Sequence, residues 1–108
     1  MAEAFANRGV AYVRKGDYDN AIADCTEAIR LNPKDATAYH NRGNAYVKKG
    51  DLDHAIADYT EAIRLSPKAG WVYHFRGEAY AKKGEKAKAE EDFAEAKKLG
   101  YKPKQEAR

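Results

Sequence analysis

The strongest constraint on the fold is an internal repeat with a period of 34 residues. Residues 2–35 and 36–69 are identical at 24 of 34 positions, and residues 36–69 and 70–103 at 15 of 34. A repeat of this length is one supersecondary unit that cannot bury its own apolar surface, so neighbouring units must stack. We therefore interpret the 108 residues as one domain of three repeats over these ranges, followed by a tail at 104–108.

Each repeat has the residue pattern of two helices joined at a glycine. In the first copy Phe5, Gly9 and Tyr12 follow the i, i+4, i+7 spacing that places three residues on one helix face. Gly16 is expected to end this helix, because glycine tolerates the left-handed conformation found at helix C-termini. A second helix with a face of small residues follows and stops before Pro33. The pattern predicts a closely packed antiparallel hairpin.

This helix–turn–helix unit resembles the tetratricopeptide repeat. The residues that carry the resemblance are those at the family's Gly, Tyr, Ala and closing Pro positions: Gly9, Gly43, Gly77, Tyr12, Tyr46, Tyr80, Ala21, Ala55, Ala89, Pro33 and Pro67. The third copy has Tyr101 in place of the proline. The resemblance implies an all-α fold, an α-solenoid of three hairpins in a right-handed superhelical stack with a concave groove. It also implies a non-catalytic adaptor that binds a peptide or protein segment in that groove.

One departure from the family's pattern is an arginine where the family has leucine. In each repeat an aspartate follows this arginine by 16 residues, and folding the hairpin back at its glycine brings the two opposite each other. An arginine stem can pack on aromatic rings while its guanidinium bonds a carboxylate. We therefore predict three structural ion pairs, Arg8–Asp24, Arg42–Asp58 and Arg76–Asp92. An arginine with a functional role is the alternative interpretation.

One flank of the second helix in each repeat should cover the next repeat, and its residues become charged in the last copy. It is apolar in the first two copies, where its residues are Tyr18, Ile22, Ile29, Leu52, Ile56 and Ile63. The same positions in the third copy hold Lys86, Glu90 and Lys97. Terminal repeats need a polar outer face. We therefore expect the third repeat to cap itself and the array to end with it.

The first helix of each repeat has a second flank whose residues differ strongly between copies. In the resembling family this flank lines the groove, which gives a predicted peptide-binding set of Val10, Val13, Thr37, His40, Asn41, Asn44, Val47, Trp71, His74, Phe75, Glu78 and Lys82. Trp71 and Phe75 stand one turn apart and are the first candidates for contact, since large aromatics are enriched among binding hot spots. The alternative is that Trp71 packs on the start of its own helix or on residues 101–108.

Two specialised kinds of binding are disfavoured. The family's carboxylate clamp for chaperone tails needs five residues, of which this chain has only Asn41, so no such clamp is predicted. The net charge of +3 comes from residues 70–108, where lysines alternate with acidic residues as on a solvated helix, which argues against nucleic acid. A basic surface for polyanions is the least favoured alternative.

No residue pattern typical of catalysis or of a cofactor is present, so we predict no enzyme activity, no metal and no cofactor. Cys25 stands in a packing position, and the histidines are too far apart for one metal ion. A mean hydropathy of −0.87 excludes a membrane span, and one cysteine without a signal peptide favours the cytoplasm. We expect a monomer; the alternative function is self-association through Trp71 and Phe75, or through the tyrosine-rich N-terminal flank.

Overall fold

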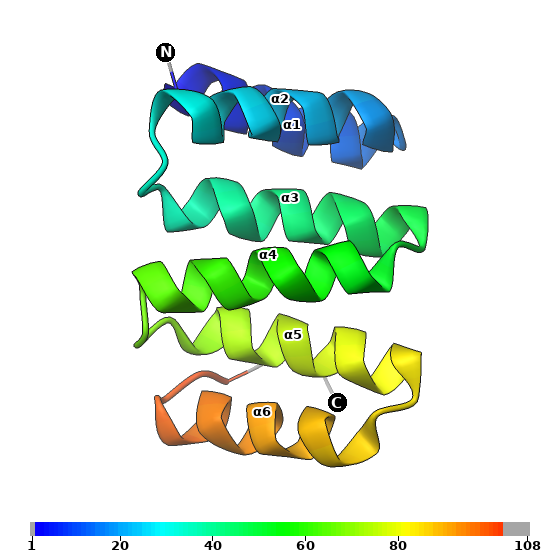
Figure 1. Cartoon of the computed structure of the whole chain (residues 1–108), viewed down its shortest axis with the longest axis vertical. Helices are drawn as coiled ribbons and strands as arrows, with labels where there is room; N and C mark the ends of the chain where they lie inside the picture. The colour runs from blue at the N-terminus through cyan, green and yellow to red at the C-terminus, as the bar shows by residue number, and fades with distance from the viewer. Residues whose placement is uncertain (1, 103–108) are drawn as a thin grey trace.

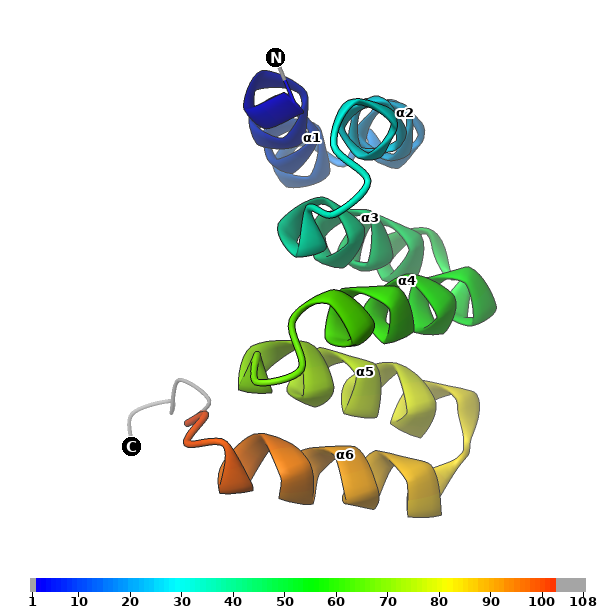
Figure 2. The ribbon, with the colours of Figure 1, turned by 60° about the vertical axis from the view of Figure 1, so that its left-hand side comes forward.

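The computed structural model describes residues 2–102, and over that range it has six α-helices and no strand. They are α1 (Ala2–Lys15), α2 (Tyr18–Leu31), α3 (Ala36–Lys49), α4 (Leu52–Leu65), α5 (Gly70–Lys83) and α6 (Lys86–Lys98). The helices form three antiparallel hairpins stacked along the long axis (Figure 1). Each hairpin is turned relative to the one before, so that α1 and α2 are seen end-on where α5 and α6 are seen from the side (Figure 2).

The predicted all-α solenoid of hairpins is confirmed by this arrangement. None of the helices within residues 2–102 combines the length and the hydropathy that crossing a bilayer would require. The predicted tail at 104–108, together with Pro103 of the third repeat, lies outside the described residues.

Glycines and aspartates set the helix ends. Gly50 ends α3 and Gly84 ends α5 with φ of 91° and 92°, in the left-handed region that only glycine enters without strain. The Asp35 carboxylate then caps α3 by accepting from the backbone N–H groups of its first turn. Ala69 precedes α5 and has no side chain that could do the same. The start of α5 depends instead on packing, because Gly70 is buried.

The two helices of a hairpin lie too close together for a Cβ atom at the conserved glycine position of the repeat. A Cβ on Gly43 would be 2.7 Å from Cε1 of Tyr59, and one on Gly77 would be 2.8 Å from Cε1 of Phe93. The largest core cluster lies around this close approach in the middle of the stack; its buried members are Ala55, Tyr59, Ala62, Ala69, Val72 and Ala79.

A bidentate ion pair joins the two helices of each hairpin. In the middle hairpin Nε and Nη2 of Arg42 donate to the two carboxylate oxygens of Asp58, each over 2.8 Å. The guanidinium also lies 5.6 Å from the centre of the Tyr39 ring. The two other predicted arginine–aspartate pairs are brought together in the same way: Arg8 with Asp24 at 2.6 and 3.0 Å, and Arg76 with Asp92 at 2.8 Å.

The same arginines also connect neighbouring hairpins, which the sequence analysis missed. Nη1 of Arg42 donates to Oγ1 of Thr26 in the hairpin before it, over 3.1 Å. Arg76 donates to Thr60 over the same distance. Arg8 belongs to the first described hairpin, and its side chain is 58% exposed against 20% for Arg42. The arginine therefore serves both the hairpin and the interface between hairpins.

The outer face of α6 differs from the corresponding faces of α2 and α4. Lys86, Glu90 and Lys97 are all exposed. Among their apolar counterparts, Ile29, Ile56 and Ile63 are partly buried and pack against core clusters that include residues of the next hairpin. A charged outer face at this end agrees with the expected cap, while the number of repeats in the array remains a prediction.

Candidate functional site

A hollow of about 240 Å³ is lined by residues of α1, α3, α4 and α5. Its covered part is apolar or aromatic and includes Val47, Phe75 and the ring of Tyr59. Its exposed part is charged and includes Glu78 and Lys82. We call this space the central hollow; its full lining is Val13, Asn44, Val47, Lys48, Tyr59, Phe75, Glu78, Ala79 and Lys82.

A smaller hollow of about 80 Å³ continues the central hollow toward α1. Val13 and Asn44 line both spaces, so the two adjoin. Val10 and Asn41 complete the smaller one. Two hollows in a row, crossing three first helices, give a groove with apolar walls and amide groups near its centre.

Hydrogen bonds fix the amide of Asn44 in this groove. The hydroxyl of Tyr59 donates to Oδ1 of Asn44, and Nδ2 of Asn44 donates to Nε2 of His40 over 3.2 Å. Burial raises the pKa of Tyr59, which keeps its hydroxyl protonated and able to donate. The amide is therefore held in one orientation beside the apolar wall.

His40 lies beneath the groove surface and does not face it, contrary to the expectation of a groove-lining imidazole. It is only 8% exposed, and its ring centre lies 5.7 Å from that of Tyr59, 6.4 Å from that of Trp71 and 5.2 Å from that of Phe75. Nδ1 has no hydrogen-bond partner within the described residues. Burial lowers the pKa of His40 to about 4, so the ring is neutral at neutral pH.

The two aromatics that were expected to act together are divided between two surfaces. Phe75 lines the central hollow, whereas Trp71 lines a shallow hollow of about 430 Å³ formed with residues 65–69. Side chains on a helix lean toward its N-terminus, so Trp71 in the first turn of α5 reaches the preceding loop. The indole remains 43% exposed, so it is available for contact although it also packs near the start of its own helix.

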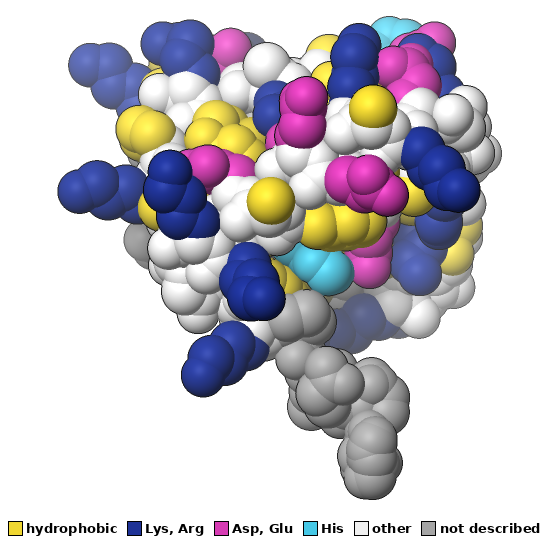
Figure 3. All heavy atoms as spheres, turned by 90° about the horizontal axis from the view of Figure 1, so that it is seen from below, with side chains coloured by type: hydrophobic (Ala, Val, Ile, Leu, Met, Phe, Trp, Pro, Cys, Tyr) yellow, Lys and Arg dark blue, Asp and Glu magenta, His cyan; other side chains and the backbone are white. Residues whose placement is uncertain are grey.

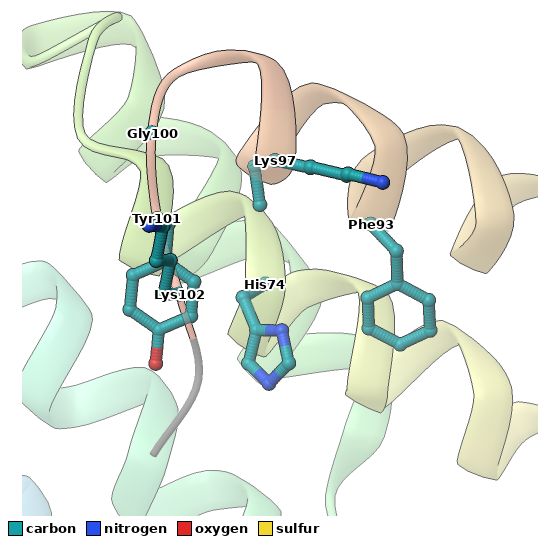
Figure 4. Close-up of a pocket in the computed structure, with 7 residues that line it drawn as sticks. His74, Phe93, Lys97, Gly100, Tyr101 and Lys102 are labelled. Atoms are coloured by element: carbon teal, nitrogen blue, oxygen red, sulfur yellow. The ribbon is translucent and has the colours of Figure 1, made fainter. Parts of the chain in front are cut away.

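The two remaining predicted groove residues lie in hollows separate from the groove. Thr37 lines a surface hollow with Ala6, Asn7 and Asp35. His74 bonds Glu78 over 3.1 Å and lines a separate hollow against α6 (Figure 4). Six of the twelve predicted groove residues therefore line the central hollow, two more line its extension, and the other four lie elsewhere: Thr37, His40, Trp71 and His74.

Among the described side chains the possible metal ligands are dispersed, and Cys25 lies in the core. Those described side chains include no group of three His, Cys, Asp or Glu residues placed as metal ligands would be. Cys25 is buried, and desolvation raises its pKa to about 11. A thiol with that pKa stays protonated at neutral pH and is a poor nucleophile.

Sequence comparison finds the repeat throughout most of the chain. A family model described as "TPR repeat" matches residues 9–50 and 43–84, and one described as "Tetratricopeptide repeat" matches residues 72–99. No curated protein sequence matches the chain.

Solved structures with the same fold align over nearly the whole chain. The second TPR of Spaghetti (RPAP3), solved with the HSP90 peptide SRMEEVD, is 30% identical with a TM-score of 0.87, and the alignment covers 91% of both chains. The Arabidopsis OM64 TPR domain is 30% identical with a TM-score of 0.89, over 92% of this chain and 82% of that one. MamA is 32% identical with a TM-score of 0.87, over 92% of this chain and 58% of that one.

Proposed function

The chain belongs to the tetratricopeptide repeat family, and from this we propose that it is a non-catalytic interaction module that binds an extended peptide segment in the groove formed by the central hollow and its extension. One observation carries the proposal. The apolar side chains that line the groove lie between exposed charged side chains. A bound segment could therefore bury its apolar groups and pair its charges at the same time.

The cations of the groove favour a segment that carries carboxylates. Lys48 and Lys82 line the central hollow, and Arg14 holds the same repeat position in α1; all three are exposed, and none forms an ion pair with the side chains described, those of residues 4–102. Their sequence neighbours Lys49 and Lys83 are paired with aspartates on adjacent hairpins. The unpaired row is therefore free to meet charge from a partner, and complementary charge speeds and orients docking.

A related domain supports this class of ligand without defining the partner. The HSP90 peptide in the RPAP3 structure, SRMEEVD, contains three acidic residues. The present chain matches the carboxylate clamp only at Asn41, so its acidic ligand would be held by other groups. We assign that role to Lys48 and Lys82, beside the apolar wall of Val47 and Phe75.

The test is phage-display selection of 12-residue peptides against the immobilised chain, followed by affinity measurement in solution. We expect the selected peptides to be rich in Asp and Glu next to one apolar residue. The double variant Lys48→Glu/Lys82→Glu should weaken them about tenfold or more, and Lys34→Glu, an exposed lysine outside the groove, should not. Peptides that bind the double variant and the parent equally would refute the groove assignment.

Light scattering over a concentration series distinguishes peptide binding from self-association of the chain. If the groove binds a segment of a partner and not a second copy, the measured mass should remain that of one chain at every concentration. A mass that rises with concentration and falls on adding the selected peptide would show that a second copy occupies the groove.

A further inference from the structure

A second hollow, distinct from the groove, opens at the α6 end of the stack. It has a volume of about 580 Å³ and is lined by His74, Phe93, Ala96, Lys97, Gly100, Tyr101 and Lys102. The rings of Tyr101 and Phe93 stand on either side of His74, with centres 5.1 and 5.4 Å from it (Figure 4). No residue lines both this space, which we call the end hollow, and the central hollow.

The equivalent position in the preceding repeat shows which kind of element fills the end hollow. One repeat earlier, the counterparts of His74, Phe93 and Ala96 are His40, Tyr59 and Ala62. There α5 covers all three: Val72 shares a buried cluster with Tyr59 and Ala62, and the rings of Phe75 and Trp71 pack on His40. A helix with aromatic side chains fills this position inside the array, whereas at the α6 end within residues 2–102 the position is open.

The charge at the end hollow differs from that of its internal counterpart. Lys97 stands where the previous repeat has Ile63, and it is exposed and unpaired among the described residues. Lys102 adds a second cation to the lining. The α6 end viewed as a surface shows apolar side chains beside a histidine, with Lys and Arg side chains projecting at its edges and Asp and Glu side chains among them (Figure 3). An occupant must therefore combine apolar groups with negative charge.

We propose that the end hollow is a docking site for an amphipathic helix of a partner protein, which presents an aromatic side chain to Phe93 and Tyr101 and a carboxylate to Lys97. This site goes beyond the groove and does not depend on it. A second copy fits less well, because its α1 has Ala4 and Asn7 at the positions of Val72 and Phe75 and offers no aromatic side chain there.

The probe for this site is a peptide copy of α5, the helix that already fills the equivalent space. It comprises residues 69–83 with a lactam bridge between Glu78 and Lys82, since an isolated helix of this length is marginal in water. Both bridged residues are exposed in α5, so the bridge replaces no buried contact. An acidic form carries Arg76→Glu, because Arg76 reaches Thr60, whose counterpart on α6 is Ala94, within one turn of Lys97.

Binding is measured by fluorescence anisotropy and mapped by amide chemical shifts of the labelled full chain. We expect the acidic peptide to bind about fivefold more tightly than the native peptide, and to shift the amides of Gly100 and Tyr101. On the Lys97→Glu variant this preference should reverse in favour of the native peptide. The matched variant Lys86→Glu, an exposed lysine at the other end of α6, should keep the parent's preference.

The aromatic contact is tested in the peptide, so that the fold of the protein is not disturbed. Phe75→Ala together with Trp71→Ala in the acidic peptide should weaken binding about thirtyfold or more. Unchanged affinity would contradict an aromatic occupant. The proposal is also overturned if neither peptide binds, if the shifts fall on Asn44 and Val47 in the groove, or if Lys97→Glu does not reverse the preference.

The same experiment also tests two other possible occupants of the end hollow. Binding that appears only in a chain ending at Lys102 would overturn the proposal in favour of the chain's own residues 103–108. A dimer dissociated by the peptide would overturn it in favour of a second copy. Either result leaves the phage-display outcome for the groove unaffected, so the two proposals fail separately.

Discussion

Both carboxylate oxygens of Asp58 accept a hydrogen bond from the guanidinium of Arg42, each at 2.8 Å, and the aspartate is buried. The third bond of that guanidinium goes to Thr26 of the preceding hairpin. The hydrogen bonds that Arg42 donates to Asp58 raise the pKa of Arg42, so its guanidinium stays charged. The Arg42 side chain thus stabilises its own hairpin and the junction with the preceding one. Substitutions in this pair should therefore report on the stability of the whole array.

Removing Asp58 should cost more than removing the equivalent aspartate of the first hairpin. Asp58→Ala leaves a guanidinium that is only 20% exposed without its main acceptor, at a cost of about 1–3 kcal/mol in unfolding free energy. Asp24→Ala should cost less, because Arg8 is 58% exposed and water can replace the aspartate. Urea unfolding of both variants measures the difference. Equal midpoints for both variants and the parent would show that the pairs do not stabilise the fold.

The burial of His40 should make the protein less stable in mild acid. The pKa is about 4 in the folded chain and 6.5 in the unfolded chain, so between these pH values the unfolded state binds more protons. Stability is therefore full above pH 6.5 and falls as the pH approaches 4, by about 3 kcal/mol for this group.

The control for this effect is His40→Phe, which keeps an aromatic ring among Tyr59, Trp71 and Phe75 but cannot titrate. Urea unfolding at several pH values between 4 and 7 should show a steeper loss for the parent than for the variant. Parallel pH profiles would mean that another group accounts for the acid sensitivity.

Trp71 should matter for binding more than for folding. Trp71 lines a hollow beside the groove and not the groove itself, but the stretch of α5 from Lys82 to Trp71 is about 16 Å long, so an extended 12-residue peptide bound in the groove can reach the indole. Trp71→Ala is expected to weaken the selected peptide by about thirtyfold while the melting temperature stays nearly constant, since the indole is 43% exposed.

Ile56→Ala is the matched control, because Ile56 packs against the core cluster and does not line the groove. It should lower the melting temperature first, with affinity changing only as the fold is lost. If Trp71→Ala instead unfolds the chain, the indole is a packing residue and its place in the binding site is lost.

Restoring an apolar face on α6 should make the chain assemble. The triple variant Lys86→Leu/Glu90→Ile/Lys97→Ile recreates the pattern that covers the next hairpin elsewhere in the stack. This face would meet the exposed Ala4 and Ala11 side of α1 in another copy, a head-to-tail contact that extends without closing. Sedimentation velocity should show growing species with concentration; a single unchanged species would contradict the capping role.

Features that depend on one repeat were predictable from sequence, while features that depend on two were not. The pairing of Arg42 with Asp58 followed from the hairpin alone, because the turn at the glycine sets which residues face each other. The burial of His40 did not, because the side chains that cover it come from the next hairpin.

One of these missed contacts did leave a signal in the sequence. Thr26 precedes Arg42 by the same 16 residues that separate Thr60 from Arg76. The spacing equals that of the ion pairs, but here the partner of the arginine lies 16 residues before it, in the preceding repeat. The split between Trp71 and Phe75 had no such signal, since it depends on how the loop at residues 65–69 folds against the indole.

The junction between Thr26 and Arg42 is reproduced at Thr60 and Arg76 with the same atoms and the same 3.1 Å length. A junction of this kind is independent of how many hairpins come before it. Duplicating residues 36–69 in place would therefore recreate every such bond and lengthen the groove by one hairpin. A copy added after α6 would instead meet Ala94 where the threonine belongs. Insertion in the middle of the stack therefore keeps this bond, whereas addition after α6 does not.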